Sequence, residues 1–131
     1  MVKELKSGLL IPDLLVLAKN IKDMPLEVLR DRLIKAVDSE RGKVFIDEGP
    51  EEIDGFIFAT IENFDGEDAV FIQAASVRPG TNNAHELLNR VKLWGREIGL
   101  TKAYCLTPRN PAPFIRKFGF KFYSNALKLD L

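Results

Sequence analysis

The segment SVRPGTNNAHELL, residues 76–88, holds the residues best suited to binding an anion. An apolar run ends in this segment and an amphipathic run begins, which places backbone N–H groups at the positive end of a helix dipole. Gly80 allows a ligand to approach the backbone closely, and the polar residues that follow it add hydrogen-bond donors. The segment is therefore suited to binding a phosphate. The alternative interpretation is a tight strand-to-helix turn with an asparagine cap and nothing bound.

The chain has one cysteine, Cys105, and one histidine, His85. These counts exclude an internal disulfide and a multi-cysteine zinc site and argue against a catalytic zinc centre, so no metal is expected. Cys105 lies in the apolar run AYCLT, a context typical of a small buried hydrophobic residue. Pro12 and Lys19 interrupt the first apolar run well below membrane-spanning length. We read no targeting signal and expect a cytoplasmic protein.

The charges of the chain balance, with 19 basic and 19 acidic residues. No net charge therefore draws the molecule to nucleic acid or to an anionic membrane, and neither is expected as a partner. With 131 residues, of which 46% are hydrophobic, the chain is long and apolar enough to fold around one core. It contains no repeat, low-complexity tract or linker. The sequence therefore predicts a single domain over residues 1–131.

Hydrophobic periodicity predicts a mixed α and β protein. Asn83 and Glu86 have the spacing of a capping box at the start of a long helix. A right-handed crossover between parallel strands is expected over residues 68–107. In chain order the expected elements are a strand at residues 2–6, a helix at 12–21, a helix from a cap at Asp23 to near Ser39, antiparallel strands near 43–48, 52–62 and 68–77, a helix from Ala84 to a C-terminal cap at Gly99, a strand at 101–107, a short helix within 108–120, and a closing strand at 121–131.

This order of elements, with DGFIF at residues 54–58, ASVRP at 75–79 and FIRKFGF at 114–120, resembles the GNAT superfamily of N-acetyltransferases over nearly the whole chain. The resemblance implies a mixed, mostly antiparallel sheet of about six strands flanked by helices on both faces. It also implies that the fourth and fifth strands splay apart and hold acetyl-CoA between them. The implied activity is transfer of the acetyl group to a primary amine.

The resemblance assigns cofactor binding to a strand end, the loop after it and the start of a helix. Members of the superfamily carry a glycine-rich pyrophosphate loop here, and this chain keeps only Gly80 and Ala84 of that motif. Members also carry a tyrosine that acts as an acid, and this chain has Ile115 at that position. Acetyl-CoA is therefore expected in a degenerate site, with backbone N–H groups near Ser76 and Val77 stabilising the oxyanion. The residues expected to contact acetyl-CoA or CoA are Ser76, Val77, Arg78, Gly80, Thr81, Asn82, Asn83, Ala84, Asn110 and Arg116.

Attack on a thioester needs a neutral amine, and a carboxylate usually supplies the base. Asp47 falls near the end of one expected strand, and Glu62 at the end of the next. Glu62 is the candidate base, because Gln73 in the following strand cannot serve as one. Tyr104 and Tyr123 are candidate acids, since both lie on elements beside the expected cleft. For each candidate the alternative is ordinary packing or a solvated charge.

Two functions are open at this point. The chain is either an N-acetyltransferase acting on a small-molecule or protein amine that the sequence does not identify, or a catalytically inactive GNAT-fold module for binding or assembly. The resemblance implies that the basic residues Arg109, Arg116 and Lys117 can contact CoA, and the alternative is a solvated helix face. Nucleic acid is the weaker partner, because the aromatic residues among them alternate as in a core. The final strand leaves an edge that can pair with a second copy in a homodimer.

Overall fold

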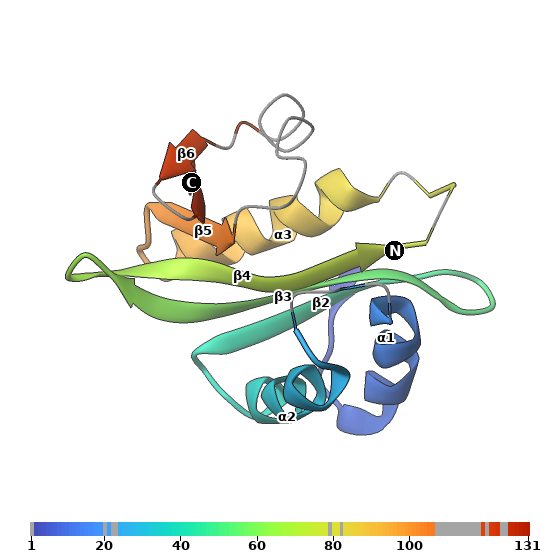
Figure 1. Cartoon of the computed structure of the whole chain (residues 1–131). Coiled ribbons are helices and arrows are strands. Elements are labelled where there is room, and N and C mark those ends of the chain that lie inside the picture. Colours follow the sequence, from blue (N-terminus) through green and yellow to red (C-terminus); the bar gives the residue numbers. More distant parts are fainter. Residues whose placement is uncertain are drawn as a thin grey trace.

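The computed structural model contains one sheet of seven strands in the order β1-β2-β3-β4-β5-β7-β6 (Figure 1). It describes residues 2–19, 21, 24–78, 80–81, 83–106, 119, 121–123 and 126–131. β4 and β5 pair in parallel, and the other neighbouring strands pair antiparallel. The elements are β1 (Val2–Glu4), η1 (Gly8–Leu10), α1 (Ile11–Ala18), α2 (Leu26–Val37), β2 (Gly42–Glu48), β3 (Ile53–Phe64), β4 (Glu67–Val77), α3 (Ala84–Glu97), β5 (Lys102–Leu106), β6 (Lys121–Tyr123) and β7 (Ala126–Asp130).

The predicted fold class is confirmed: the sheet is mixed and mostly antiparallel, with helices on both faces. The predicted crossover over residues 68–107 is present as β4, α3 and β5. The predicted closing strand at 121–131 is in fact two strands, because β6 and β7 pair with each other and Tyr123 lies opposite Ala126. This split accounts for the seventh strand. The short helix expected within 108–120 lies outside the described residues, apart from Gly119.

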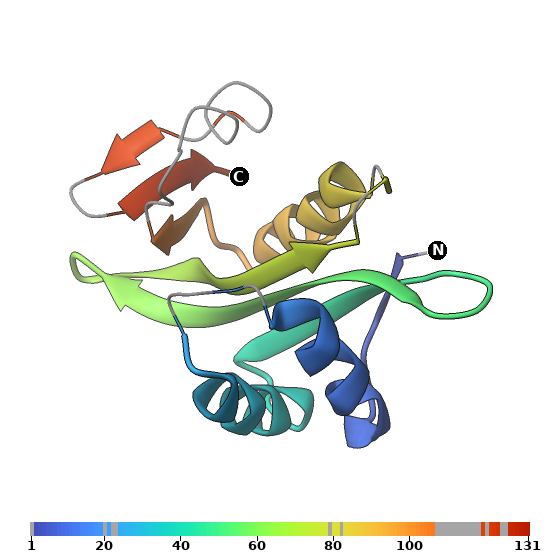
Figure 2. The same cartoon turned by 45° about the vertical axis from the view of Figure 1, so that its right-hand side comes forward.

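α1 and α2 cover one face of the sheet, and α3 covers the other (Figures 1 and 2). Side-chain alternation along β2 produces this division, because successive residues of a strand point to opposite faces. Val44 and Ile46 belong to the core beneath α1 and α2, whereas Phe45 belongs to the core beneath α3. The sheet is therefore buried on both faces at β2.

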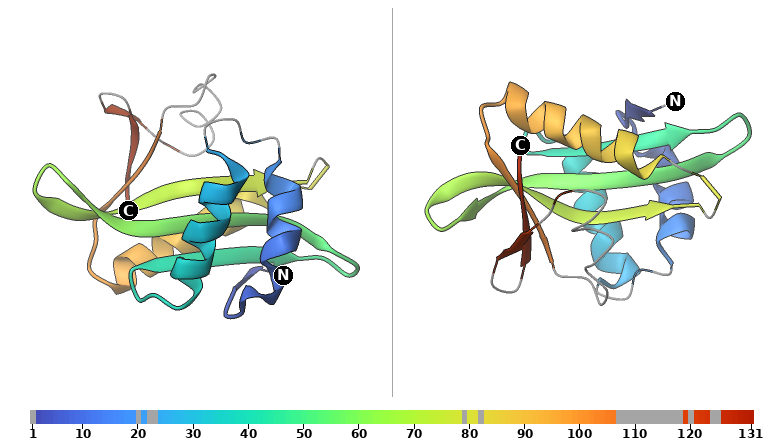
Figure 3. Two further views of the ribbon diagram at one scale, coloured as in Figure 1. Left: turned by 60° about the horizontal axis from the view of Figure 1, so that its bottom comes forward. Right: turned by 90° about the horizontal axis from the view of Figure 1, so that it is seen from above.

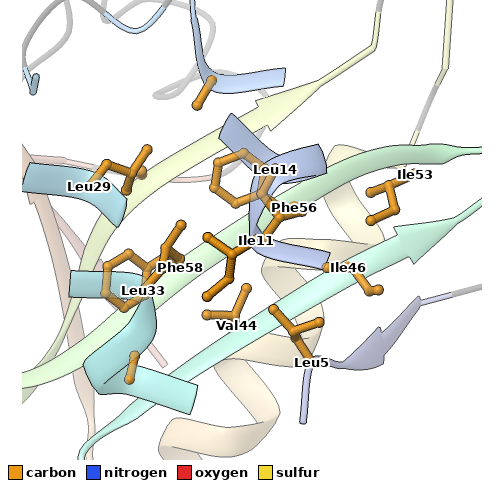
Figure 4. Packing of buried hydrophobic residues seen from close by; sticks show 13 residues of the cluster. Leu5, Ile11, Leu14, Leu29, Leu33, Val44, Ile46, Ile53, Phe56 and Phe58 are labelled. Atoms are coloured by element: carbon orange, nitrogen blue, oxygen red, sulfur yellow. The ribbon is translucent and has the colours of Figure 1, made fainter. Parts of the chain in front are cut away.

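The core beneath α1 and α2 is built mainly from large apolar side chains, shown in Figure 4. Leu14 of α1 and Leu33 of α2 are fully buried together with Phe56 and Phe58 of β3. Burying a side chain of this size contributes about 1.5–3 kcal/mol. These contacts fix both helices against the middle of the sheet.

The helix boundaries follow local signals in part. α1 carries Pro12 in its first turn, where a missing N–H costs nothing, and ends at Ala18, before the predicted end at 21. α2 has Pro25 at its N-cap and no side-chain cap, and the predicted cap Asp23 lies outside the described residues. Within the residues that the structure describes, no helix is both long enough and apolar enough to cross a membrane.

Candidate functional site

β4 and β5 pair over a short distance and then separate. Val70–Ile72 pair with Ala103–Cys105. β4 continues along β3 to Val77, but from Gln73 onward it has no partner on the β5 side within the described part of the chain. Figure 3 shows β5 and β7 running at a steep angle to β4. The splay implied by the family resemblance is thus present between the fourth and fifth strands.

Gln73 is an extra residue on β4 at the point where this separation begins. Phe58 and Ala59 of β3 are consecutive, but their partners on β4 are Ala74 and Ile72, so Gln73 stands between two ladder positions. A β-bulge of this kind bends the strand and redirects a side chain. Here the Gln73 side chain reaches the α2 side of the sheet, where it is bound by a side chain of α2.

After β4, hydrogen bonds between Thr81 and Arg78 close a tight turn. The Thr81 N–H donates to the Arg78 carbonyl over 3.2 Å, and Thr81 Oγ1 donates to the same oxygen over 2.7 Å. Gly80 has a φ of +87°, a conformation that favours glycine, and apart from its two chain neighbours no atom of the described residues lies within 4 Å of where its Cβ would stand. The backbone at Gly80 is therefore open to a ligand, whereas the Thr81 N–H is used within the turn.

Arg78 anchors this loop to the first residues of β3 and to Glu52 just before that strand. Its backbone N–H donates to the Asp54 carbonyl over 2.7 Å, and its guanidinium donates to the Ile53 carbonyl over 3.0 Å. The guanidinium also lies 3.2 Å from a carboxylate oxygen of Glu52 and 3.6 Å from one of Asp54. Arg78 would have to release these carboxylates before it could hold a phosphate.

Asn83 and Glu86 do not form the predicted capping box. Asn83 precedes α3, but its side chain makes no cap hydrogen bond. Instead, its amide donates to the carboxylate of Asp47 on β2, which is 2% exposed. A hydrogen bond to a buried carboxylate is charge-assisted and stronger than a neutral cap bond, so Asn83 favours this partner. α3 nevertheless begins at Ala84, as predicted.

Asp47 is a neighbour of the site whose importance sequence reasoning missed. The available signal was the alternation of side chains along a strand. Phe45 faces α3, so Asp47, two residues later on the same strand, faces α3 as well. Among the described residues, Asp47 is the only buried one with a charged side chain. A buried anion beside the first turn of α3 is stabilised by the positive end of the helix dipole. The carboxylate of Asp47 therefore compensates part of the positive potential at the N-terminus of α3.

The strand end, the turn and the helix start bring most of the predicted cofactor residues together. Ser76 and Val77 end β4, Gly80 and Thr81 form the turn, and Ala84 begins α3. The Ser76 hydroxyl donates to the carbonyl of Leu17 over 2.8 Å, so this side chain faces α1. The predicted residues Asn82, Asn110 and Arg116 lie outside the described residues, as do Arg109, Ile115 and Lys117.

A cavity of about 520 Å³ opens on the α2 side of the sheet. It is bounded by the second half of α2, the connection from α2 to β2, and the middle of β3 and β4. Because Gln73 lies in its wall, the cavity reaches the bulge at which β4 and β5 separate. Its polar side chains include Arg32, Lys35, Arg41, Thr60, Glu62 and Gln73.

Four of these side chains form one hydrogen-bonded chain. Arg32 Nη1 donates to Gln73 Oε1 over 2.8 Å, Gln73 Nε2 donates to Thr60 Oγ1 over 3.0 Å, and Thr60 Oγ1 donates to Glu62 Oε1 over 3.0 Å. A guanidinium can only donate and an ionised carboxylate can only accept, so the two ends fix the direction of the chain. Sequence reasoning named Glu62 but missed Arg32 and Thr60, since local spacing gives no sign that α2 and β3 meet there.

Tyr104 is the buried member of an aromatic stack whose other two rings, Phe64 and Phe71, are half-buried. Its ring centroid lies 4.3 Å from that of Phe64, which lies 5.6 Å from that of Phe71. Tyr104 is 5% exposed, which fits the packing interpretation. Its role as an acid stays a prediction. The same holds for Tyr123, whose backbone lies in β6 and whose side chain is outside the described part of the structure.

Cys105 occupies the last position at which β5 pairs with β4. Burial raises the pKa of its thiol to about 11, and a hydrogen bond with the backbone of Leu127 lowers it only in part. The thiol is therefore protonated at neutral pH and is a poor nucleophile. In the described ranges, no three His, Cys, Asp or Glu side chains lie close enough together to hold a metal ion.

Comparison with known proteins relates this architecture to solved structures. A scan of protein-family models and a search of curated proteins each gave no match. A protein from Desulfovibrio desulfuricans assigned to the GNAT family of acetyltransferases aligns with a TM-score of 0.78 and 13% identity, over 99% of this chain and 98% of that chain. The aminoglycoside 6'-N-acetyltransferase of Acinetobacter haemolyticus aligns with a TM-score of 0.77 and 13% identity, over 95% and 92% of the two chains.

The PaiA N-acetyltransferase of Thermoplasma acidophilum, solved in complex with coenzyme A, aligns with a TM-score of 0.75 and 12% identity, over 100% of this chain and 99% of that chain. The protein therefore has the fold of the GNAT acetyltransferases. The resemblance first drawn from DGFIF, ASVRP and FIRKFGF is confirmed at the level of the fold. Since one fold can host many functions, activity has to be argued from the site.

Proposed function

We propose that the protein is an N-acetyltransferase that transfers an acetyl group from acetyl-CoA to a primary amine. The supporting observation is the position of Gln73, which stands where β4 and β5 separate and also in the wall of the cavity beside α2. A group held between the strands and a molecule in the cavity would meet at this residue. The coenzyme A bound by the Thermoplasma neighbour supports the same proposal.

Acetyl-CoA supplies an acetyl thioester, and the residues of the splay fit it in part. Gly80 leaves its backbone open, and α3 begins without a side-chain cap, so N–H groups of its first turn can donate to a pyrophosphate. The β4 edge from Gln73 to Val77 can hydrogen-bond an extended amide-bearing arm. Backbone N–H groups near Ser76 and Val77 would stabilise the oxyanion that develops during transfer.

Glu62 is the group that we propose accepts a proton from the amine. An alkyl amine is protonated in neutral water and must lose a proton before it can attack a thioester. Glu62 lies in the wall of the cavity that Gln73 also lines, and Thr60 links the two. Tyr104 and Tyr123 remain candidates for the acid that protonates the leaving thiolate.

Calorimetric titration of acetyl-CoA and of free CoA into the protein tests the proposal. Gly80→Glu puts a carboxylate into the open space beside the loop, and we expect it to abolish binding. Gly66→Glu is the matched control, because Gly66 has a φ of +86°, has equally open surroundings and lies in the distant β3–β4 turn. The expected result is micromolar binding that is lost only in Gly80→Glu. No heat with either ligand up to millimolar concentration would overturn the proposal.

A catalytically inactive binding or assembly module is the second candidate. This candidate is favoured because polar groups of the loop after β4 already bind other groups of the protein. Arg78 pairs with Glu52 and Asp54, and the Thr81 N–H closes the turn. Such a module would release no thiol from acetyl-CoA with any amine. A thiol-release assay on protein that binds CoA in calorimetry separates the two functions.

A further inference from the structure

We propose that the amine acceptor is a small molecule that also carries an anionic group, a carboxylate or a phosphate. This inference rests on the proposed function, because it names the substrate class of the cavity beside α2. Among the side chains that line the cavity, Arg32, Lys35 and Arg41 are cationic, and Glu62 is the single carboxylate. The cavity therefore concentrates positive charge in a chain whose formal net charge is zero.

The two cations contributed by α2 are available to a ligand. Arg32 hydrogen-bonds the neutral amide of Gln73, and it forms no ion pair with a carboxylate of the described residues. Lys35 lies three residues further along α2, on the same side of the helix, and has no ion-pair partner among the described residues. Arg41 is 3.8 Å from Asp68, but both side chains are about half exposed, so this ion pair is weak.

The hydrogen-bonded chain holds the Arg32 guanidinium and the Glu62 carboxylate at opposite ends, while the third cation, Arg41, donates to the carbonyl of Ile61, the residue before Glu62. An amine that approaches Glu62 places the rest of its molecule toward Arg32 and Lys35. An anionic group there can take charge-assisted hydrogen bonds from the guanidinium, whereas a second ammonium would meet two like charges. The cavity thus favours anionic amines over polyamines.

A series of three-carbon amines tests this charge preference by direct binding, without acetyl-CoA. The four probes share one amine and differ at the other end: 1,3-diaminopropane, 3-amino-1-propanol, β-alanine and 3-aminopropylphosphonate. Measured by NMR titration at low salt, the two anionic probes are expected to bind roughly fivefold or more tightly than the alcohol, and the diamine most weakly. The difference should shrink as salt is added. Comparing the affinity for β-alanine with that for 3-aminopropylphosphonate shows whether the cavity prefers a carboxylate or a phosphate.

Variants on α2 connect the preference to this cavity. Lys35→Gln and Arg32→Gln should each weaken binding of the anionic probes severalfold and leave the alcohol unchanged. Arg30→Gln is the matched control, because Arg30 is an exposed residue of the same helix, pairs with Asp31 and does not line the cavity. Equal binding of all four probes, tightest binding of the diamine, or no binding at all would overturn the inference. Failure of the proposed function looks different: the anionic probes bind in the expected order, but no thiol is released from acetyl-CoA.

Discussion

Asn83, the residue before α3, donates a hydrogen bond from its side-chain amide to the buried carboxylate of Asp47 on β2. Asp47 lies opposite Gly55 on β3, and Gly55 lies opposite Val77 at the end of β4. The contact therefore links the loop after β4 to a strand two positions away in the sheet. It fixes where α3 begins relative to the β4 edge that faces the splay.

Removal of this contact should destabilise the protein. Asn83→Ala takes a donor away from a buried carboxylate, so we expect the free energy of unfolding to fall by about 1–3 kcal/mol in urea denaturation. A double-mutant cycle with Asp47→Ala should give a clear coupling energy. Asn63→Ala is the control, because the Asn63 side chain accepts an exposed turn hydrogen bond from the Gly66 N–H and has no buried partner among the described residues. Equal losses in Asn83→Ala and Asn63→Ala would contradict the assignment.

Gly55 permits a close approach between β3, β4 and α3. A Cβ at this position would lie 3.1 Å from the Ser76 carbonyl oxygen and 3.3 Å from Leu87 Cδ1. Because the carbonyl oxygen is part of a sheet and cannot move freely, Gly55→Ala should lower stability by about 1–3 kcal/mol. Gly8→Ala serves as the control, since its nearest contact would be 3.7 Å. Indistinguishable melting temperatures for the two variants would refute this account.

The buried thiol of Cys105 makes stability depend on pH in the alkaline range. Its pKa is raised from 9.0 to about 11 in the folded protein. Between these values the unfolded chain loses the thiol proton while the folded chain keeps it, so stability should fall as pH rises from 9 toward 11, by at most about 2 kcal/mol. Other groups titrate in this range, so the measurement is the difference between wild type and Cys105→Ala. Identical slopes in the two proteins would show that the thiol is not desolvated.

Cys105 also reports on the gap between β4 and β5. It is the single cysteine of the chain and lies at the last paired position before the strands separate. If CoA enters this gap, saturating CoA should slow alkylation of Cys105 by iodoacetamide severalfold at pH 9. The same CoA concentration should give no protection in Gly80→Glu. Protection that persists in Gly80→Glu would place the ligand elsewhere.

Glu62 and Tyr104 should differ sharply in their effect on acetyl transfer. Glu62→Gln removes the proposed base, so kcat should fall by about 100-fold and recover as pH rises and more of the amine is neutral. Tyr104→Phe keeps the buried ring, so the packing interpretation of Tyr104 predicts a nearly unchanged kcat. Glu27→Gln, an exposed α2 substitution outside the cavity, is the charge control. A large kcat loss in Tyr104→Phe would instead assign the acid role to that residue.

The sequence by itself determined the order and type of the elements. Local pattern is enough to reveal these elements, because each signal depends on neighbours along the chain. The signals are the β-branched and aromatic residues of the three strands within 43–77, the turn residues Asp65 and Gly66 between two of them, and the helical spacing from Ala84 to Gly99. The order strand, helix, strand predicts a crossover between parallel strands, and the chirality of the chain makes a right-handed connection the expected one. The division of the closing segment into β6 and β7 was not determined in this way, because both strands carry the same kind of alternation.

Only the tertiary structure decided which polar groups meet. Asn83 finds Asp47 across 36 positions of the chain, and Arg32 finds Gln73 across 41. A short-range pattern pointed to a capping box for Asn83 because it compares residues within one turn, where Glu86 is the available partner. The partners are decided instead by how the helices pack on opposite faces of the sheet. The packing of α3 brings Asn83 to the buried carboxylate of Asp47, and the packing of α2 brings Arg32 to Gln73 on the bulged strand.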